Sequence, residues 1–216
     1  ASRPVRWAVG VAPTIEIGID HATPRTTFGE IARPLLFPHS AVDWCEQVWT
    51  SRDQRFTFAG LMTPDRLETL NQWSLRTGGG AIRPRHHLVR RLRPGASMKG
   101  LPRGVKVWAS GRVRVYPDKA WDEDYFRTLG RSEFVLCPSG DFVWTYRVFE
   151  AALCGAIPVA EATCEAYGDL IVRSLDDDAA SLEWDAEIAR RNRDEAVRLV
   201  TASHAELRGS LEAAVS

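Results

Sequence analysis

The stretch FVLCPSGDFVWTYRVFEAALCGAIPVAE, residues 134–161, decides the fold of this chain. It opens with a short apolar segment, FVLC, which is typical of a strand buried in a parallel sheet. A Pro-Ser-Gly turn follows, and Thr145 stands where a helix N-cap is expected. The helix should run to Cys154, where Gly155 stops it, and AIPVA then predicts another buried strand. The stretch therefore predicts a strand, a turn, a helix and a second strand.

The same alternation continues on both sides of this stretch. Further strands are expected at 55–60, 105–110 and 169–174, and helices at 64–76, 119–129 and about 185–214. Strands that alternate with helices favour right-handed crossovers. We therefore expect an α/β fold: a single Rossmann-like domain with a mostly parallel sheet flanked by helices. Residues 1–54 would form an N-terminal extension packed on the core, and residues 55–216 the α/β domain with its C-terminal helix.

The N-terminal extension gives weaker patterns. Residues 5–19 predict one or two short strands, and residues 41–50 a short helix. Thr27 and Glu30 have capping-box spacing, which predicts that a helix starts within 27–32. Near the other end, Asp176-Asp177-Asp178 is interpreted as the N-cap of a helical tail rather than a metal site.

The composition excludes several classes of protein. The chain has 216 residues, 44% hydrophobic and 26% charged, with a formal net charge of +0. Balanced charge argues against a general polyanion binder. No apolar run approaches the roughly 18 residues that span a membrane. The four cysteines form no C-x-x-C pair, which favours free thiols in a reducing compartment and a cytoplasmic location over disulfides or a metal site.

The 134–161 stretch also carries the candidate chemistry. Ser139 and Gly140 lie in a turn where the backbone can approach a ligand closely. The helix start at Thr145 presents free N–H groups and a partial positive charge, which attract phosphate. Arg147 can add a bidentate contact to an anion, and Glu150, on nearly the same helix face, can accept hydrogen bonds from a sugar cis-diol. The alternative is that Arg147 and Glu150 form an ordinary surface ion pair.

These residues resemble the signature of exostosin-like glycosyltransferases. The matching elements are Leu136-Cys137-Pro138-Ser139-Gly140, Arg147 with Glu150, and Gly155-Ala156-Ile157-Pro158-Val159. Upstream, RFTFAGLMTPDR (55–66) is similar to the opening of that family's nucleotide-binding half. The resemblance implies a domain similar to the C-terminal, nucleotide-sugar-binding half of a GT-B enzyme.

The resemblance also implies roles for individual residues. Arg147 would bind the donor diphosphate, Glu150 the ribose hydroxyls, and Ser139 and Gly140 would line the phosphate pocket. Gly60 and Arg66 would be further phosphate contacts. Arginine and helix-dipole charge would stabilise the leaving diphosphate, so neither a metal nor a cofactor is expected. The donor would be a nucleoside-diphosphate sugar, with a UDP-sugar as the first choice, and the acceptor a hydroxyl of a glycan or small molecule.

A catalytic base is harder to predict. Asp20 is our first candidate for deprotonating the acceptor and His21 the second, although Asp-His-Ala-Thr-Pro is also good turn material. A two-domain GT-B enzyme needs about twice this length. A non-catalytic nucleotide-sugar or glycan-binding module that needs a partner subunit, or a homodimer, is therefore the alternative.

Residues 69–117 contain eleven Arg or Lys and no Asp or Glu. This basic segment could attract an anionic donor or acceptor, or it could be an exposed loop without function. Trp108 and Tyr116 interleave aromatics with the charges, so nucleic acid is a third, disfavoured partner.

Overall fold

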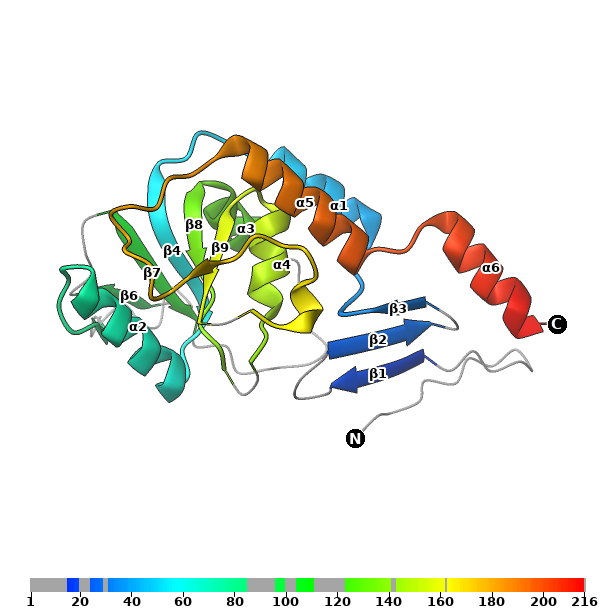
Figure 1. Ribbon diagram of the computed structural model, residues 1–216, viewed down its shortest axis with the longest axis horizontal. Coiled ribbons are helices and arrows are strands. Elements are labelled where there is room, and N and C mark those ends of the chain that lie inside the picture. Colours follow the sequence, from blue (N-terminus) through cyan, green and yellow to red (C-terminus); the bar gives the residue numbers. More distant parts are fainter. Residues whose placement is uncertain are drawn as a thin grey trace.

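The computed structural model describes residues 15–19, 24–28, 31–84, 96–99, 104–110, 123–140, 143–161 and 163–215. Its centre is a seven-stranded sheet in the order β10-β9-β8-β4-β7-β6-β5 (Figure 1). The strands are β4 (Gln54–Leu61), β5 (Arg83–Pro84), β6 (Ala96–Lys99), β7 (Val105–Ser110), β8 (Ser132–Leu136), β9 (Ile157–Ala160) and β10 (Arg173–Ser174). From β10 to β7 all neighbours are parallel, and β6 and β5 add antiparallel pairs at one edge. The mostly parallel α/β fold is confirmed.

Helices cover both faces of this sheet. They are α1 (His39–Gln47), α2 (Pro64–Arg76), α3 (Glu123–Gly130), α4 (Tyr146–Leu153) and α5 (Ala186–Val200), and a further helix, α6 (His204–Val215), follows α5 in the chain. One core packs α1, α3, α4 and α5 together, and the other packs α2 and residues 175–182. Strand β8 serves both: Val135 faces the first core, while Phe134 and Leu136 face the second. This alternation explains why residues 134–136 of β8 are all apolar.

The order of the strands creates a topological switch point. The chain enters the sheet at β4, passes through α2 to β5, β6 and β7 on one side, and returns through α3 to β8 on the other side. The connections after β4 and β8 therefore lie on opposite faces of the sheet. Ligands of open α/β sheets bind in the crevice that such a reversal leaves at the carboxyl ends of the strands.

Local sequence signals account for the helix boundaries near this crevice. The hydroxyl of Thr63 accepts the N–H of Arg66 at 3.3 Å, and Pro64 occupies the first helical position of α2. At the start of α4, Thr145 accepts the N–H of Arg147 at 3.4 Å. Gly155 adopts a φ of +73° just after α4, as its expected stop position requires. The N-cap predicted at Thr145 is confirmed, and Thr63 caps α2 in the same way.

The carbonyl end of α4 is closed by side chains. Each of three consecutive carbonyls accepts a hydrogen bond from an indole or a guanidinium: Leu153 from Trp49 (2.9 Å), Cys154 from Arg52 (3.2 Å) and Gly155 from Trp184 (3.2 Å). Carbonyls at the end of a helix lack partners within it, so these side chains stabilise the helix terminus.

The helix predicted within 27–32 is wrong. Strands β1 (Ile15–Ile19), β2 (Pro24–Phe28) and β3 (Ile31–Arg33) form a small antiparallel sheet instead. Thr27 pairs with Glu16 on one side and Ala32 on the other. Pairing across strands thus overrides the local capping-box signal. Of the strands expected within 5–19, only β1 lies in the described residues. The division between residues 54 and 55 stays a prediction.

The C-terminal region also differs from expectation. Asp176–Asp178 lie in turns, where the carboxylate of Asp177 accepts the N–H of Ser174 at 2.9 Å. The N-cap of α5 is Asp185, which accepts the N–H groups of Glu187 and Ile188 at 2.6 and 3.0 Å. The expected single tail helix is interrupted at residues 201–203, and the strand expected at 169–174 is reduced to β10.

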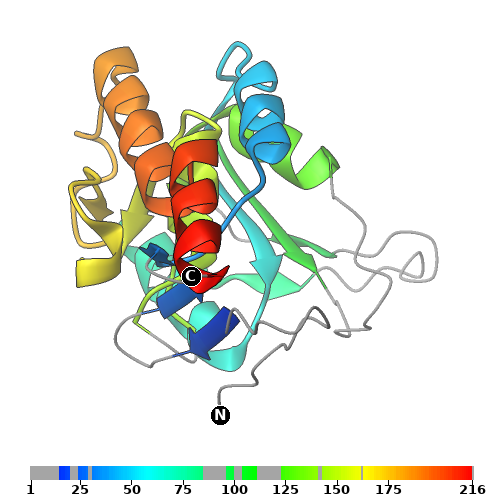
Figure 2. The ribbon, with the colours of Figure 1, turned by 90° about the vertical axis from the view of Figure 1, so that its right-hand side faces the viewer.

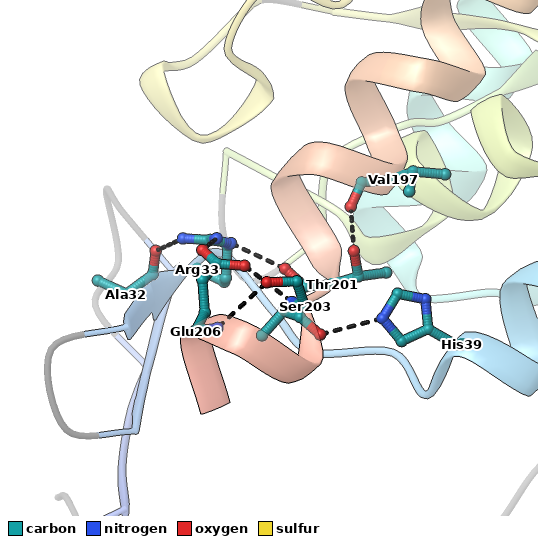
Figure 3. Close-up of polar contacts among 8 residues, drawn as sticks. Ala32, Arg33, His39, Val197, Thr201, Ser203 and Glu206 are labelled. Atoms are coloured by element: carbon teal, nitrogen blue, oxygen red, sulfur yellow. Dashed lines mark hydrogen bonds and ion pairs between the residues drawn. The ribbon is translucent and has the colours of Figure 1, made fainter. Parts of the chain in front are cut away.

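Helix α6 is attached to the small sheet rather than to the large one (Figures 1 and 2). Arg33 donates to the carbonyl of Thr201 at 2.9 Å and forms a 2.6 Å ion pair with Glu206 (Figure 3). Ser203 and Glu206 exchange hydrogen bonds of 2.8 and 3.2 Å in a reciprocal cap. Polar contacts thus hold the start of this helix.

Candidate functional site

The predicted binding residues converge at the switch point between β4 and β8. Gly60 lies near the end of β4, and Ser139 and Gly140 follow β8. Arg66 reaches them from the first turn of α2, and Arg147 from the first turn of α4. Residues that lie far apart in the sequence thus form one site at the carboxyl edge of the sheet.

Arg147 is the most buried charged group in this site. Its side chain is directed toward β4, where Nε donates to the carbonyl of Ala59 at 2.8 Å. The guanidinium lies 4.5 Å from the ring centroid of Phe58, within range of a cation–π interaction. The residue is only 6% exposed, so the alternative of a surface ion pair with Glu150 is wrong.

One nitrogen of Arg147 is left without a partner. Its Nη1 is buried and makes no hydrogen bond within the described part of the chain. Nε atoms of Arg173 and Arg193 share this property, so an unpaired nitrogen alone does not mark a site. Arg147 differs because it lies at the switch point. A buried unpaired donor costs free energy, and an anion bound there would recover it.

Gly60 leaves the space that the guanidinium occupies. A Cβ atom at this position would overlap Nη2 of Arg147. The backbone of Gly60 also has a φ of +151°, which side-chain-bearing residues rarely adopt. Both the space and the conformation require glycine, which explains why a glycine stands near the end of β4.

Arg66 links the two loops of the site. Its Nη1 donates to the carbonyl of Leu61 at 3.1 Å, and its Nε donates to that of Ser139 at 3.3 Å. A Cβ atom on Gly140 would lie 2.6 Å from Nη2 of Arg66, so the absence of a side chain permits this packing. Arg66 thus lies beside the Pro-Ser-Gly turn, while its role as a phosphate contact stays a prediction.

Glu161 is a site residue that the motif analysis missed. One carboxylate oxygen accepts the backbone N–H of Ser139 at 3.0 Å, and the other accepts the hydroxyl of Thr69 at 2.6 Å. Burial raises the pKa of Glu161, but hydrogen bonds from Ser139 and Thr69 outweigh it and hold the pKa below its usual value. The signal was its position: Glu161 directly follows β9, at the carboxyl edge where ligands bind.

Glu150 has a partner from α3 that the sequence did not reveal. Its carboxylate accepts a short hydrogen bond from the hydroxyl of Tyr125. Burial, followed by the charge of Glu150, raises the pKa of Tyr125 well above its usual value, while Arg147 opposes the shift. Tyr125, Arg147 and Glu150 are therefore close enough to interact electrostatically.

Several other residues of interest lie outside this site or outside the described residues. Asp20 and His21, the candidate bases, lie outside the described residues, as does most of the basic segment after Pro84. Beside the site, Trp144 is buried in the core, whereas the neighbouring Tyr146 is 48% exposed. In the described residues, no group of three or more potential metal ligands occurs. Nor does any described helix combine the length and apolar character needed to cross a bilayer.

Comparison with known proteins agrees with this reading of the signature. Residues 105–173 match the family model of the RXYLT1 C-terminal domain, an exostosin-like xylosyltransferase. That range includes β8, the Pro-Ser-Gly turn, α4 and β9. The resemblance to exostosin-like glycosyltransferases is therefore confirmed over the segment that forms one side of the site.

A solved structure is also similar to this chain. It is AviGT4, a glycosyltransferase involved in avilamycin A biosynthesis, with 18% sequence identity and a TM-score of 0.38. The match covers 76% of this chain and 50% of AviGT4, so the chain spans about half the length of that protein. No curated protein matches the chain in sequence.

Proposed function

We propose that this chain is a glycosyltransferase that binds a nucleoside-diphosphate sugar at the β4–β8 switch point. The observation that carries the proposal is the buried guanidinium of Arg147, whose Nη1 has no hydrogen-bond partner among the described residues and lies at the edge where α/β sheets bind ligands. The family match over residues 105–173 supports the transferase assignment at a coarse level.

The diphosphate would lie between the two arginines. Arg147 and Arg66 supply positive charge from two sides, and the start of α4 adds the positive end of its dipole. Thr145 N–H donates to the hydroxyl of Tyr167 at 2.9 Å, so that amide is occupied within the fold. The guanidinium groups are therefore the main donors that we assign to the phosphates.

The ribose would lie toward Glu150. An ionised carboxylate accepts hydrogen bonds, and the two hydroxyls of a ribose donate them. The hydroxyl of Tyr125 already donates to this carboxylate, which fixes the orientation of the carboxyl group. Glu150 is thus a positioned acceptor rather than a freely rotating surface side chain.

The transfer breaks the bond between the anomeric carbon and the diphosphate oxygen and forms one to the acceptor oxygen. Negative charge develops on the departing diphosphate, where Arg147 and Arg66 would stabilise it electrostatically. The acceptor proton passes to a base, for which Asp20 and His21 remain the candidates. A UDP-sugar is the first donor to test.

The decisive experiment measures binding and turnover separately. Isothermal titration with UDP, GDP, ADP and dTDP and their glucose conjugates should identify a ligand. Arg147→Met should weaken its affinity roughly ten- to hundredfold, because a hydrogen bond to a charged group contributes about 1.5–3 kcal/mol. Arg208→Met, which removes an exposed charge on α6, should leave the affinity unchanged.

Turnover then separates the enzyme from the binding module. Release of the nucleoside diphosphate from the bound donor, with or without an added acceptor glycan, supports a transferase. Tight binding with no release under any condition would instead support the non-catalytic module. Absence of binding across the panel at millimolar concentration would refute the donor site itself.

A further inference from the structure

Glu161 places a negative charge where an anion would otherwise bind. Its carboxylate accepts the Ser139 N–H, the first amide of the turn after Pro138. A turn with a free N–H beside two arginines would be a ready phosphate site. Here the protein's own carboxylate takes that donor.

The carboxylate is held firmly in this position. Thr69 donates to its second oxygen from the middle of α2, and the charge of Arg66 also favours its ionised form. The carboxylate therefore bridges Ser139 and Thr69 and lies close enough to Arg66 for the two charges to interact.

We propose that Glu161 determines the selectivity of the site for a nucleoside-diphosphate sugar over the free nucleoside diphosphate. The inference rests on the proposed function and deepens it. In the sugar conjugate, the terminal phosphate is a diester with one negative charge. In the free diphosphate, this phosphate carries close to two charges at neutral pH, because its second pKa is about 6.

A fixed carboxylate beside the terminal phosphate repels the second charge. Two unit charges 4 Å apart interact by about 1 kcal/mol in water, and more strongly at lower effective dielectric. Glu161 would thereby disfavour the product, which must leave, relative to the donor, which must bind. By the same argument, Arg147 attracts the more highly charged free diphosphate more strongly, so Glu161 opposes the preference that the arginines set.

The test compares two dissociation constants in three proteins. UDP and UDP-glucose, or the pair whose base binds best, are titrated into the wild type, Glu161→Gln and Glu212→Gln. The ratio of the constant for the diphosphate to that for its conjugate should fall about fivefold in Glu161→Gln. Glu212→Gln changes the net charge equally on exposed α6 and should not alter the ratio.

A third ligand separates charge from sugar contacts. The methyl ester of the diphosphate's terminal phosphate has the charge of the conjugate but no sugar. If Glu161 acts through charge, Glu161→Gln should leave this ester's affinity as little changed as that of UDP-glucose. A larger gain for the ester than for the conjugate would overturn the proposal.

The remaining outcomes are also distinct. The carbonyl oxygen of glutamine can still accept the N–H of Ser139, and its NH2 group can donate to the hydroxyl of Thr69, so thermal unfolding should show that the variant remains folded. If Glu161→Gln changes the affinities of diphosphate and conjugate by the same factor, or changes neither, the selectivity role is wrong while the donor site stands. If the wild type binds none of these ligands, both the selectivity role of Glu161 and the proposed function are wrong.

Discussion

The two ends of helix α4 both carry an arginine, but their hydrogen bonding differs. At the carboxyl end, Arg52 donates to the carbonyls of Gly130 (2.9 Å), Ser132 (2.7 Å) and Cys154 (3.2 Å). At the amino end, Arg147 donates through Nε to the carbonyl of Ala59 and keeps Nη1 unpaired within the described residues. An arginine whose donors are used within the protein stabilises the fold. One with an unused donor is suited to bind a ligand.

Arg52→Met should have the largest effect on stability and none on binding. The substitution leaves three carbonyls without this donor and removes the guanidinium that lies 5.0 Å from the Trp184 ring centroid. We expect the free energy of unfolding to fall by about 3 kcal/mol, since each buried unsatisfied group costs about 1–3 kcal/mol. Urea denaturation followed by tryptophan fluorescence measures this. A loss below about 1 kcal/mol would contradict the structural role of Arg52.

Gly60→Ala, near the other end of α4, should reduce ligand affinity as well as stability. The new Cβ would displace the Arg147 guanidinium, so nucleotide affinity should fall about tenfold while stability falls by about 1–2 kcal/mol. Gly78→Ala is the control, because Gly78 also has a positive φ (+82°) but nothing lies within 4 Å of its added Cβ. Equal affinities in the two variants would show that Arg147 does not need the space at Gly60.

The smallest effect is expected at the half-buried Arg33. Arg33 is paired with Glu206, whose pKa is lowered by hydrogen bonds from Ser203 and by Arg33. The pKa of Glu206 in the folded chain lies below its unfolded value of about 4.3, so its ion pair with Arg33 stabilises the fold above that pH. This stabilisation is lost as the pH falls through the folded pKa. When the pH is lowered through this range, the amide chemical shifts of residues 204–215 should change at a higher pH than those of α4. Simultaneous change in both helices would argue against a separately attached α6.

The sequence predicted the large sheet well because its signals are local and coincide. Thr63 with Pro64 and Thr145 with Gly155 mark helix ends by caps that act within a few residues. The Thr27–Glu30 spacing gave a wrong helix because pairing with β1 and β3 depends on residues distant in the sequence. The break at residues 201–203 depends likewise on the contact of Arg33 with Thr201.

The part of the site that lies at strand ends could also be predicted from the sequence. Gly60, Arg66, Ser139, Gly140 and Arg147 come together because strand ends of a parallel sheet share one edge. Tyr125, Thr69 and Glu161 were not assigned to the site, since their partners are fixed only when α2, α3 and β9 pack. Motifs thus locate the edge, whereas the polar contacts between elements require the fold.

The contact between Arg147 and Phe58 has a consequence for how recognition is achieved. The charged side chain is immobilised by strand β4 during folding, so its rotamer entropy is lost before any ligand arrives. Association then avoids the usual cost of ordering a long, flexible cation. Conversely, a cell rich in the ligand would keep more of this protein folded, because binding selects the state in which that cation is already in place.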